Sequence, residues 1–444
     1  MKFKSIFWFA CVCMLALSAC VGGASEEAET PAGGGSVDEN GNVTLEFWYS
    51  LSGTSGETIE AMVEQFNEAH ENINVVATYQ GNYSAMMAKV YSALAGDTMP
   101  NVAQLGGAPL LGSSGAILPI TDFTESDDSM DLGSFLPAFL DYNSAGGTLW
   151  SMPFNNSVPV MYYNRDLFTA AGLDPDQPPQ NFEELIAAAG QMTLDPDNTG
   201  TPTQYGLNAR DDTHWFLSTM FLENDAQIVS ADMSEMLYNS PEAVEMLALW
   251  DQMVNEYQIM PANQHAEAQT DFLAGKLAML FGSSASINSI KDSATFDLGV
   301  SMFPKVGDNE SKIPIGGGSL VIFKNENDAI RAASWEFVKF MTSRESSIYL
   351  STNTGYLPLY SDAMDWPEIQ ALMAEEPLRI AAIQTLDAAV AIPVFNALGN
   401  SDLALRKAVE EVELGVATPQ EALDDAVASV NRAIQEQYAV TETP

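Results

Sequence analysis

The apolar block 153–164 constrains the fold of this chain more than any other stretch. Its residues alternate with the period of two that a β-strand requires, with Val158, Val160 and Tyr162 on one side and Pro159, Met161 and Tyr163 on the other. A polar run, 155–157, precedes them and offers amide and hydroxyl groups. Residues 164–173 then predict a short helix closed by a glycine. The block is expected to enter a sheet at a functional site, and a plain buried strand, turn and helix is the alternative.

Strands and helices alternate in the first part of the body. Residues 43–49, 73–79 and 101–105 predict strands, and two helices lie between them. The helical faces are expected to carry Ile59, Met62, Val63 and Phe66 in the first helix and Met86, Val90 and Leu94 in the second. This order predicts an α/β fold with a largely parallel sheet. Ligands in such sheets lie beyond the carboxyl ends of the strands, so Tyr49, Tyr83 and Gly106 are expected near one crevice.

The second half continues with helices and further strands. Strands are predicted at 278–281, 296–303 and 319–323, with the glycine-rich run 315–318 between the last two. Ser283 follows a strand at a helix start, which suits either an anion site or a simple helix cap. A turn at 352–358 is expected to expose Tyr356. Thr418 and Glu421 have the spacing of a capping box.

The chain is strongly acidic, with 17 Lys and Arg against 60 Asp and Glu and a formal net charge of −43. Such a surface repels phosphate backbones, so no nucleic-acid partner is expected. It favours solubility, above all where salt screens the repulsion. At 444 residues, 46% of them hydrophobic and 17% charged, the chain has the composition of a globular protein with two or more domains.

The first 42 residues predict export and anchoring. Lys2 and Lys4 precede an apolar core, 6–17, that is too short for a stable membrane span. The run Leu17-Ser18-Ala19-Cys20 resembles a bacterial lipobox, whose cysteine thiol receives a lipid; a secretory signal with an incidental cysteine is the alternative. Residues 21–42 are rich in Gly, Ser, Glu and Ala and predict a flexible tether. One acylated cysteine would tether the protein outside the membrane.

Cleavage before Cys20 would remove two lysines and both other cysteines. The mature chain would keep 15 basic and 60 acidic residues, a charge of −45. With Cys20 as its one thiol, it is expected to have neither an intramolecular disulfide nor a cysteine metal site.

Motifs of catalysis are sparse. The three histidines (His70, His214 and His265) lie in no metalloprotease pattern, and the sequence has neither a Gly-x-Ser-x-Gly elbow nor a phosphate-binding loop with its lysine. We therefore predict a protein that is not an enzyme and needs no cofactor, although abundant acids leave a secreted glycosidase open. The acidic run 195–201 is either a calcium loop or an Asx-rich turn, but Gly206 stands where a calcium loop needs a bidentate Glu.

Seven stretches in order along residues 43–436 together resemble the extracellular solute-binding proteins of ABC importers, and among them the branch that binds glycerol 3-phosphate. They are Phe47–Trp48, Thr78–Tyr83, Pro153–Asn164, Ala171–Pro179, Ile315–Leu320, Thr354–Pro358 and Thr418–Asp424. The resemblance implies a two-lobed α/β fold of the periplasmic-binding-protein type, with a hinge and discontinuous lobes. The signal would be 1–19 and the lipidated Cys20 with its linker 20–42. The N-lobe would comprise 43–152 and 296–350, and the C-lobe 153–295 and 351–440.

The resemblance also implies six ligand-binding residues, which are Tyr83, Ser157, Ser283, Gly317, Tyr356 and Arg406. Ser283 and the close backbone of Gly317 would suit phosphate oxygens, and Arg406 would give a charge-assisted fork. Tyr83 and Tyr356 would supply hydroxyls and rings to the glycerol. The alternative for Arg406 is a solvated helix residue, since Lys407 and three acids follow it.

Two positions depart from the pattern of that branch. Gly106 stands where that branch has a glutamate of its ligand set, and Phe182 stands where it has a tryptophan that lines the site. The missing glutamate removes an acceptor for hydroxyls and leaves room for a ligand larger than glycerol 3-phosphate, such as a glycerophosphodiester or a sugar. The net charge also repels an anion at long range, so capture would rely on local donors and on screening by salt.

The prediction is a monomeric, lipid-anchored, extracytoplasmic binding protein of an ABC importer, in the periplasm or on the outer face of the cytoplasmic membrane. It would close on glycerol 3-phosphate or a glycerophosphodiester and dock on a membrane permease driven by a cytoplasmic ATPase. One alternative is the same fold with a neutral oligosaccharide stacked on Trp48, Trp215, Tyr83 and Tyr356, Arg406 then being structural. Others are the glycosidase and an adhesion or scaffold lipoprotein with no small ligand.

Overall fold

The computed structural model describes residues 34–196, 200–230, 234–392 and 398–441. The predicted signal, Cys20 and the first part of the tether lie outside them. Among the described residues, no helix combines the length and the apolar character that a membrane span needs.

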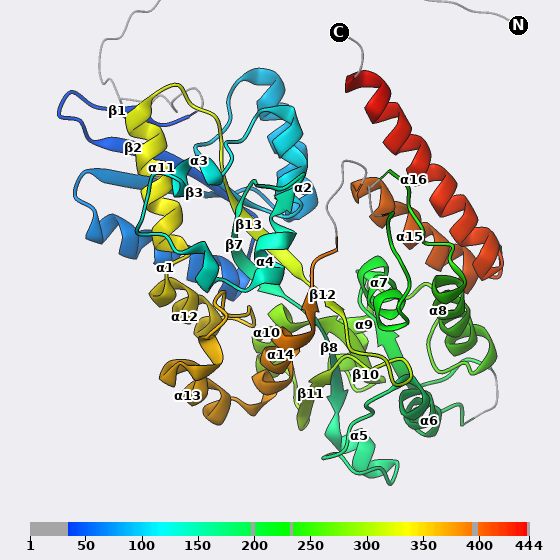
Figure 1. The fold of residues 1–444 in the computed structure, drawn as a ribbon. Coiled ribbons are helices and arrows are strands. Elements are labelled where there is room, and N and C mark those ends of the chain that lie inside the picture. Colours follow the sequence, from blue (N-terminus) through cyan, green and yellow to red (C-terminus); the bar gives the residue numbers. More distant parts are fainter. Residues whose placement is uncertain (1–33, 197–199, 231–233, 393–397, 442–444) are drawn as a thin grey trace, which may run out of the picture. The chain divides into compact units, whose positions relative to one another are not determined.

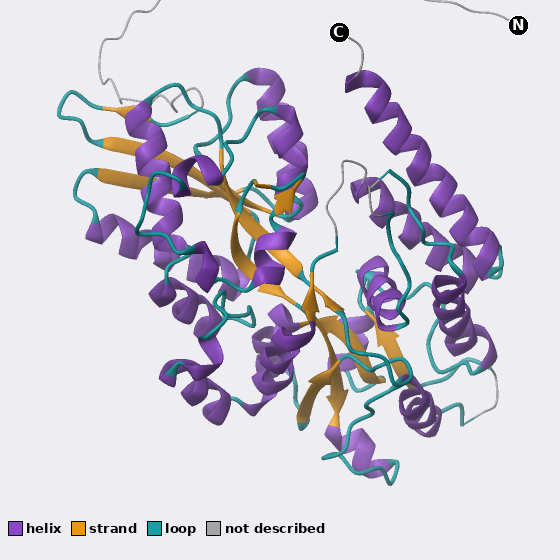
Figure 2. Ribbon diagram, in the orientation of Figure 1, coloured by secondary structure: helices purple, strands orange, loops and turns teal. Residues whose placement is uncertain are grey.

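Two mixed β-sheets organise the folded body (Figures 1 and 2). The first has the order β1–β2–β4–β13–β7, with β3 beside β2. Its strands are β1 (Ser36–Val37), β2 (Val43–Tyr49), β3 (Ile73–Tyr79), β4 (Val102–Leu105), β7 (Met152–Ser157) and β13 (Gly316–Ile322). Strand β2 is parallel to β3 and β4, whereas β13 is antiparallel to β4 and β7. The first two predicted strands are therefore confirmed at both ends.

The second sheet has the order β11–β8–β10–β9. It comprises β8 (Pro159–Asn164), β9 (Tyr205–Ala209), β10 (Leu277–Ser283) and β11 (Leu298–Met302). Strand β8 is antiparallel to both of its neighbours, and β9 and β10 are parallel. The predicted largely parallel sheet is therefore wrong. The β-α-β order covers β2 to β4 alone, and the strands that return from the other lobe arrive antiparallel.

Helices flank both sheets (Figure 2). Those of the first part are α1 (Gly53–Ala69), α2 (Tyr83–Gly96), α3 (Thr121–Thr124), α4 (Pro137–Tyr142), α11 (Asp328–Met341), α12 (Arg344–Asn353) and α13 (Pro367–Glu375). Helix α1 buries the predicted face of Ile59, Met62, Val63 and Phe66, so that prediction is confirmed. Phe66 and Phe337 of α11 pack edge to face with their ring centroids 5.1 Å apart.

Nine helices of the described residues are associated with the second sheet. They are α5 (Arg165–Ala170), α6 (Phe182–Met192), α7 (Thr213–Glu223), α8 (Pro241–Asp251), α9 (Ala268–Leu273), α10 (Ile287–Ser293), α14 (Ile380–Gln384), α15 (Leu398–Glu413) and α16 (Pro419–Thr441). The capping box before α16 is confirmed, because the Thr418 N–H donates to Glu421 Oε2 at 3.0 Å and the Glu421 N–H donates to Thr418 Oγ1 at 3.3 Å.

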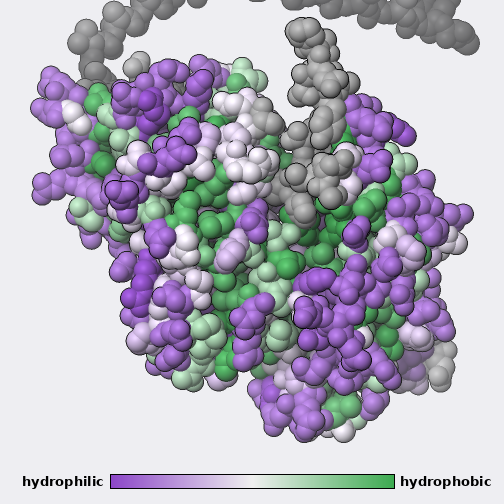
Figure 3. Space-filling model, in the orientation of Figure 1, coloured by the Kyte–Doolittle hydropathy of each residue, from purple (hydrophilic) through white to green (hydrophobic). Residues whose placement is uncertain are grey.

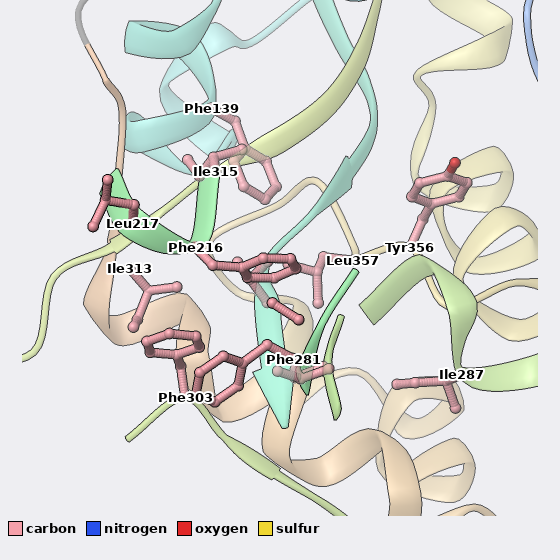
Figure 4. Packing of buried hydrophobic residues seen from close by; sticks show 14 of the residues in the cluster. Phe139, Phe216, Leu217, Phe281, Ile287, Phe303, Ile313, Ile315, Tyr356 and Leu357 are labelled. Atoms are coloured by element: carbon pink, nitrogen blue, oxygen red, sulfur yellow. The ribbon is translucent and has the colours of Figure 1, made fainter. Parts of the chain in front are cut away.

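Four phenylalanine side chains pack together in the core beside the second sheet. The rings of Phe281 and Phe303 are 4.5 Å apart, and Phe182 and Phe216 pack around them. Figure 4 shows Phe216, Phe281 and Phe303 close to Ile313 and Ile315 of the segment that returns to the first sheet. Figure 3 shows that hydrophilic side chains dominate much of the surface in this view and that hydrophobic ones gather along its middle.

The chain crosses between the sheets at Val158 and at β12 (Ile313–Pro314). Val158 joins β7 to β8, is fully buried, and exchanges two hydrogen bonds with Ser284: its N–H donates to the hydroxyl at 3.2 Å and its carbonyl accepts from the amide at 2.9 Å. Strand β12 lies between β11 of the second sheet and β13 of the first, and it pairs in parallel with β14 (Ala389–Val390). A second small pair, β5 (Ser144–Ala145) and β6 (Thr148–Leu149), lies in a hairpin.

Two strands lie across the predicted lobe boundaries. β7 belongs to the first sheet, although the N-lobe was predicted to end at 152, and β11 belongs to the second, although the N-lobe was predicted to resume at 296. The apolar run continues without a break through Val158, so periodicity gave no sign of the crossing. The exact lobe limits stay a prediction.

The predicted tether is too long at its C-terminal end. Residues 36–37 form β1 on β2, and a turn follows in which the Asp38 carboxylate accepts from the backbone N–H groups of Asn40 and Asn42, both at 2.8 Å. The Asp38 side chain thus satisfies the backbone N–H groups of the turn. A hairpin therefore forms where composition alone indicated a linker.

Candidate ligand-binding site

A buried polar network lies where the first sheet faces the second lobe. Asn155 of β7, fully buried, donates from Nδ2 to the Tyr83 hydroxyl at 2.9 Å and accepts from Gln104 Nε2 at 2.8 Å. Gln104 Nε2 also lies 3.2 Å from the Tyr83 hydroxyl. Burial raises the pKa of Tyr83, so its hydroxyl stays a neutral hydrogen-bonding group.

Glycines make room for this network. The glycines expected between two strands, Gly316–Gly318, lie within β13 opposite Asn155–Ser157, and a bulge follows Gly318. A Cβ atom at Gly318 would be 2.4 Å from Gln104 Nε2 and 2.8 Å from the Tyr83 hydroxyl. Gly317 has a φ of +106°, and a Cβ there would be 2.0 Å from the Asn155 carbonyl oxygen. Only glycine allows these strands to approach so closely.

Gly106 adjoins the same place, as predicted. A Cβ atom on Gly106 would be 3.4 Å from the Tyr83 ring and 3.6 Å from the Gly317 carbonyl oxygen. Tyr49 lies elsewhere: its hydroxyl is bonded to Glu60 of α1, and its ring packs 5.7 Å from that of Tyr79. The predicted grouping is therefore right for Tyr83 and Gly106 and wrong for Tyr49.

Tyr356 joins the network from the turn after α12. Its hydroxyl lies close enough to Tyr83, Asn155 and Ser55 to interact with them electrostatically. The side chain is 8% exposed, so the predicted exposed aromatic is wrong. The turn is drawn in because the Leu357 N–H donates to the Asn156 carbonyl at 2.9 Å. Burial raises the pKa of Tyr356 well above its ordinary value.

Ser283 and Ser157 flank this network. The Ser283 hydroxyl accepts from the Ala285 N–H at 3.2 Å, so it caps the short turn that leads into α10. The Tyr356 turn packs against the next residue, because a Cβ atom at Gly355 would be 2.0 Å from the Ser284 carbonyl oxygen. Ser157 ends β7 and pairs with Gly316. Five of the six predicted residues therefore surround the crossing segments.

Arg406 lies on α15 and is held by two carboxylates. It donates to the Asp211 carbonyl and, from Nη2, to Asp212 Oδ1 at 3.3 Å, and Nη1 lies 3.6 Å from Asp211 Oδ1. Arg406 is therefore paired on the helix surface, and whether it binds ligand stays a prediction. A phosphate would have to compete with these acids, or share the guanidinium with them.

Two side chains near Arg406, Asp402 and His214, were not predicted as ligand contacts. Asp402 lies one turn earlier on α15, and Nε2 of His214 on α7 is 3.8 Å from Asp402 Oδ2. Trp215 follows, and a Cβ atom at Gly316 would be 2.8 Å from its ring. Sequence gave no local signal for Asp402 or His214, because they meet across 188 positions of chain; Trp215 appeared as a sugar-stacking candidate.

Other aromatic positions do not line this place. Phe182 packs against Phe281 and Phe303 in the core, with centroids 6.3 and 6.0 Å away, so the position expected to line the site is structural. Trp48 packs against a separate hydrophobic cluster of the first lobe that includes Met86 and Val90. Of the aromatic groups proposed for sugar stacking, the crevice therefore keeps Tyr83, Trp215 and Tyr356.

Other candidate sites have weaker support. Hollows of about 420 and 530 Å³ lie over α11 and α12 and beside α6, and neither includes a predicted site residue. Within the described residues no cluster of three metal-ligating side chains occurs. Part of the acidic loop 195–201 lies outside those residues; in the remainder the Gly200 N–H donates to Asp195 Oδ2 at 2.8 Å.

Two α/β lobes joined by crossing segments, with polar groups of both meeting there, define a bilobal binding protein for a small solute. The model of the bacterial extracellular solute-binding protein family matches residues 61–376, and the chain belongs to this family. It is thus a solute-binding protein of an ABC importer and not an enzyme.

Known proteins of this family are similar along nearly the whole chain. The sn-glycerol-3-phosphate-binding periplasmic protein UgpB of Escherichia coli (strain K12) is 28% identical over 408 residues, which cover 88% of this chain and 92% of that protein. UgpB from Mycobacterium tuberculosis, solved with glycerophosphocholine, has a TM-score of 0.78 at 21% identity and covers 89% of this chain and 99% of its own. The cyclic alpha-maltosyl-1,6-maltose binding protein from Arthrobacter globiformis has a TM-score of 0.77 at 23% identity, covering 89% and 100%. The two structures support the two-lobed fold.

Proposed function

We propose that this protein captures glycerol 3-phosphate or a glycerophosphodiester between its lobes for import. The observation that carries the proposal is the convergence of Tyr83, Gly317 and Tyr356 at the crossing segments. These are positions that the glycerol-3-phosphate resemblance singles out, and a relative named for that ligand is 28% identical over 88% of the chain. The absence of a side chain at Gly106 leaves room for the larger diester.

Binding would work by closure of the lobes. Tyr83 and Gly317 belong to elements of the first lobe, whereas Ser283 and Arg406 belong to elements that pack on the second. A ligand that contacts both sets stabilises the closed form by its differential affinity, and that form docks on the permease. The lobes would comprise the predicted discontinuous segments, with β7 and β11 exchanged as the sheets show.

A neutral sugar is the second candidate, and a specific observation favours it. Arg406 is already paired with Asp211 and Asp212, so its positive charge is largely compensated. The nearby Trp215 ring could stack on a sugar, and its Nε1 is buried without a partner among the described residues. A neutral ligand would also escape the repulsion of the strongly acidic surface.

The protein is further proposed to act as a monomer that is anchored by a lipid on Cys20. The support is the lipobox-like run before that residue. Replacement of Cys20 by Ser should release the protein from the membrane fraction of its host into the soluble fraction. A wild-type protein that is already soluble after export would end the anchoring proposal.

The ligand is tested by thermal unfolding of the purified protein with glycerol 3-phosphate, glycerophosphocholine, maltose, trehalose or glucose. A ligand at 100 times its Kd should add about 2.7 kcal/mol of stability. We expect a shift with the phosphates. Arg406→Ala should abolish it, whereas Arg344→Ala, which removes a surface guanidinium lying 4.5 Å from the Trp366 ring, should not. A shift with sugars alone would replace the phosphate proposal by the sugar candidate.

A further inference from the structure

Asp402 is a crevice carboxylate whose hydrogen-bonding capacity is unused. Its side chain is 47% exposed, and within the described residues it makes no hydrogen bond. The preceding Ser401 is fully buried and holds the start of α15 in place through a hydrogen bond from the Tyr238 hydroxyl at 3.3 Å. An ionised carboxylate is an acceptor for up to four hydrogen bonds, so this one is fixed in position with its acceptors open.

Neither nearby base neutralises this carboxylate. His214 lies 3.8 Å away, but its own burial and the charge of Arg406 lower its pKa to about 4, so it is neutral at physiological pH. Arg406 directs its guanidinium to Asp211 and Asp212 instead. When Asp402 is ionised, its negative charge is therefore available to a ligand.

The opposite wall of the crevice belongs to the first lobe. The Tyr142 hydroxyl of α4 donates to the Gly317 carbonyl at 3.2 Å. Burial raises the pKa of Tyr142, and its neighbours Tyr83 and Asp402 raise it further, so Asp402 lies within electrostatic reach of this wall. The wall itself offers Gly106 and Gly317, which have no side-chain acceptor.

Two further polar groups at the crossing segments have no partner within the described part of the chain. Asn156 is fully buried. Its Nδ2 donates to the Gly316 carbonyl at 3.4 Å, and within that part of the chain its Oδ1 has no hydrogen-bond partner. Trp215, whose ring contacts the same glycine, leaves its buried Nε1 unpaired. Buried polar atoms without partners are costly, and a bound ligand or water would remove that cost.

We propose that Asp402 is a ligand-binding residue of this crevice, whose carboxylate accepts hydrogen bonds from two neighbouring hydroxyl groups of a polyol. The Asn156 Oδ1 atom is a second acceptor and the Trp215 Nε1 atom a donor to the same ligand. The class of ligand is a glycerol moiety or a sugar ring with vicinal hydroxyls. This inference rests on the proposed binding of a solute between the lobes, but it holds for either candidate ligand.

The environment of Asp402 makes its charge sensitive to pH. Although the side chain is partly exposed, desolvation by the surrounding protein raises its pKa to about 7; Arg406 lowers it and Asp212 raises it. Charged and titratable groups surround it from four elements. They are Arg406 of its own helix, Asp211, Asp212 and His214 at the start of α7, Tyr142 of α4 and Tyr238 before α8. Protonation below pH 7 would remove an acceptor, so affinity for a polyol should fall as the pH falls.

The test is calorimetric titration of the purified protein with glycerophosphocholine and, separately, with maltose between pH 5.5 and 8.5. Neither probe titrates in this range. Wild-type Kd should rise at least tenfold from pH 8.5 to 5.5. Asp402→Asn should weaken binding about tenfold or more at pH 8.5, in keeping with loss of a charge-assisted hydrogen bond, and should remove the pH dependence.

Asp211→Asn is the matched control. Asp211 also pairs with Arg406, at 3.6 Å, but its side chain is 76% exposed, so this variant should keep the pH dependence of the wild type and should not weaken binding. Unfolding curves establish that both variants are folded. Affinity that rises on acidification, or that Asp402→Asn leaves intact at pH 8.5, would make Asp402 a bystander and overturn the proposal.

The two proposals fail separately. If maltose binds and glycerophosphocholine does not, the glycerophosphodiester is wrong as a ligand, and the Asp402 experiment is decided on maltose by the same outcomes. If glycerophosphocholine binds and Asp402→Asn binds it equally well, the function stands and the role of Asp402 falls. A wild-type protein that binds neither probe overturns the proposal for Asp402, and glycerol 3-phosphate in the thermal-unfolding test then decides the function.

Discussion

At the scale of single residues, the site depends on where side chains are missing. Gly317 and Gly318 let β13 lie against β7 so that Tyr83, Gln104 and Asn155 can meet. The hydroxyl and amide groups then satisfy one another, which fixes their directions toward the crevice. A side chain at either glycine would separate the partners and leave polar atoms buried without hydrogen bonds.

Gly317→Ala should therefore cost both stability and binding. The left-handed backbone costs alanine about 1–2 kcal/mol, and the overlap of its Cβ with the Asn155 carbonyl adds about 1–3 kcal/mol. The control is Gly307→Ala, where φ is +59° and no atom lies within 4 Å of the new Cβ. It should lose about 1–2 kcal/mol for the backbone alone, with ligand affinity unchanged. Urea unfolding and calorimetry measure both; equal losses in the two variants would contradict the packing argument.

At the scale of elements, the C-terminal end of α12 is held by Arg379 of the segment before α14. This residue is 4% exposed, and Nη1 donates to the carbonyls of Ser351, at 2.8 Å, and Thr354. Nη2 donates to Asn288 Oδ1 of α10 at 2.7 Å. The last carbonyls of a helix lack partners within the helix and carry its negative end, so a cation is favoured there. Arg379 thereby joins the turn that carries Tyr356 to the helix behind Ser283.

Arg379→Met should uncouple these two elements. Loss of the guanidinium leaves buried carbonyls without a donor, at about 1–3 kcal/mol for each unsatisfied group, so the free energy of unfolding should fall by at least about 2 kcal/mol. Ligand affinity should fall too, because the Tyr356 turn loosens. Chemical denaturation and calorimetry test this at a temperature where the variant is folded.

Lys291→Met is the control for that substitution. Lys291 pairs with Glu376 at 2.9 Å near Arg379, but both side chains are about one-third exposed, 35% and 34%. An ion pair of this kind contributes about 1 kcal/mol or less. If Arg379→Met lost no more than Lys291→Met, the buried guanidinium would have no special part in holding the turn.

At the scale of the whole molecule, charge opposes the capture of an anion. The formal charge is −43, and screening weakens with decreasing salt as the Debye length grows from about 3 Å at 1 M to about 30 Å at 0.01 M. The groups proposed to bind phosphate must act at short range against this field.

The association rate of glycerol 3-phosphate should consequently rise several-fold between 0.02 and 0.5 M NaCl, as the repulsion is screened (about 22 Å against 4 Å in Debye length). Glycerophosphocholine, which carries no net charge, is the matched ligand and should change little. Stopped-flow fluorescence measures both rates. A rate for glycerol 3-phosphate that falls with salt would show instead that a local positive field around Arg406 governs the encounter.

The sequence by itself determined the local structure and the family of the protein. The ends of β2 and β3, the buried face of α1 and the capping box of α16 follow from alternation, helical period and short-range hydrogen bonding, which act within a few residues. Ordered motifs along the chain indicated the two-lobed fold, and the position of Tyr83 beside Gly106 followed from the end of a strand.

Tertiary structure decided strand direction, the crossing at Val158 and the environment of each site residue. Tyr356 became buried, Phe182 became core and Arg406 acquired two acidic partners, although none of these residues changes its local pattern. The partners of Arg406 lie nearly 200 positions away, and those of Asp402 come from α7 and α4. Such contacts depend on how the lobes fold back on each other, and periodicity within one segment carries no information about them.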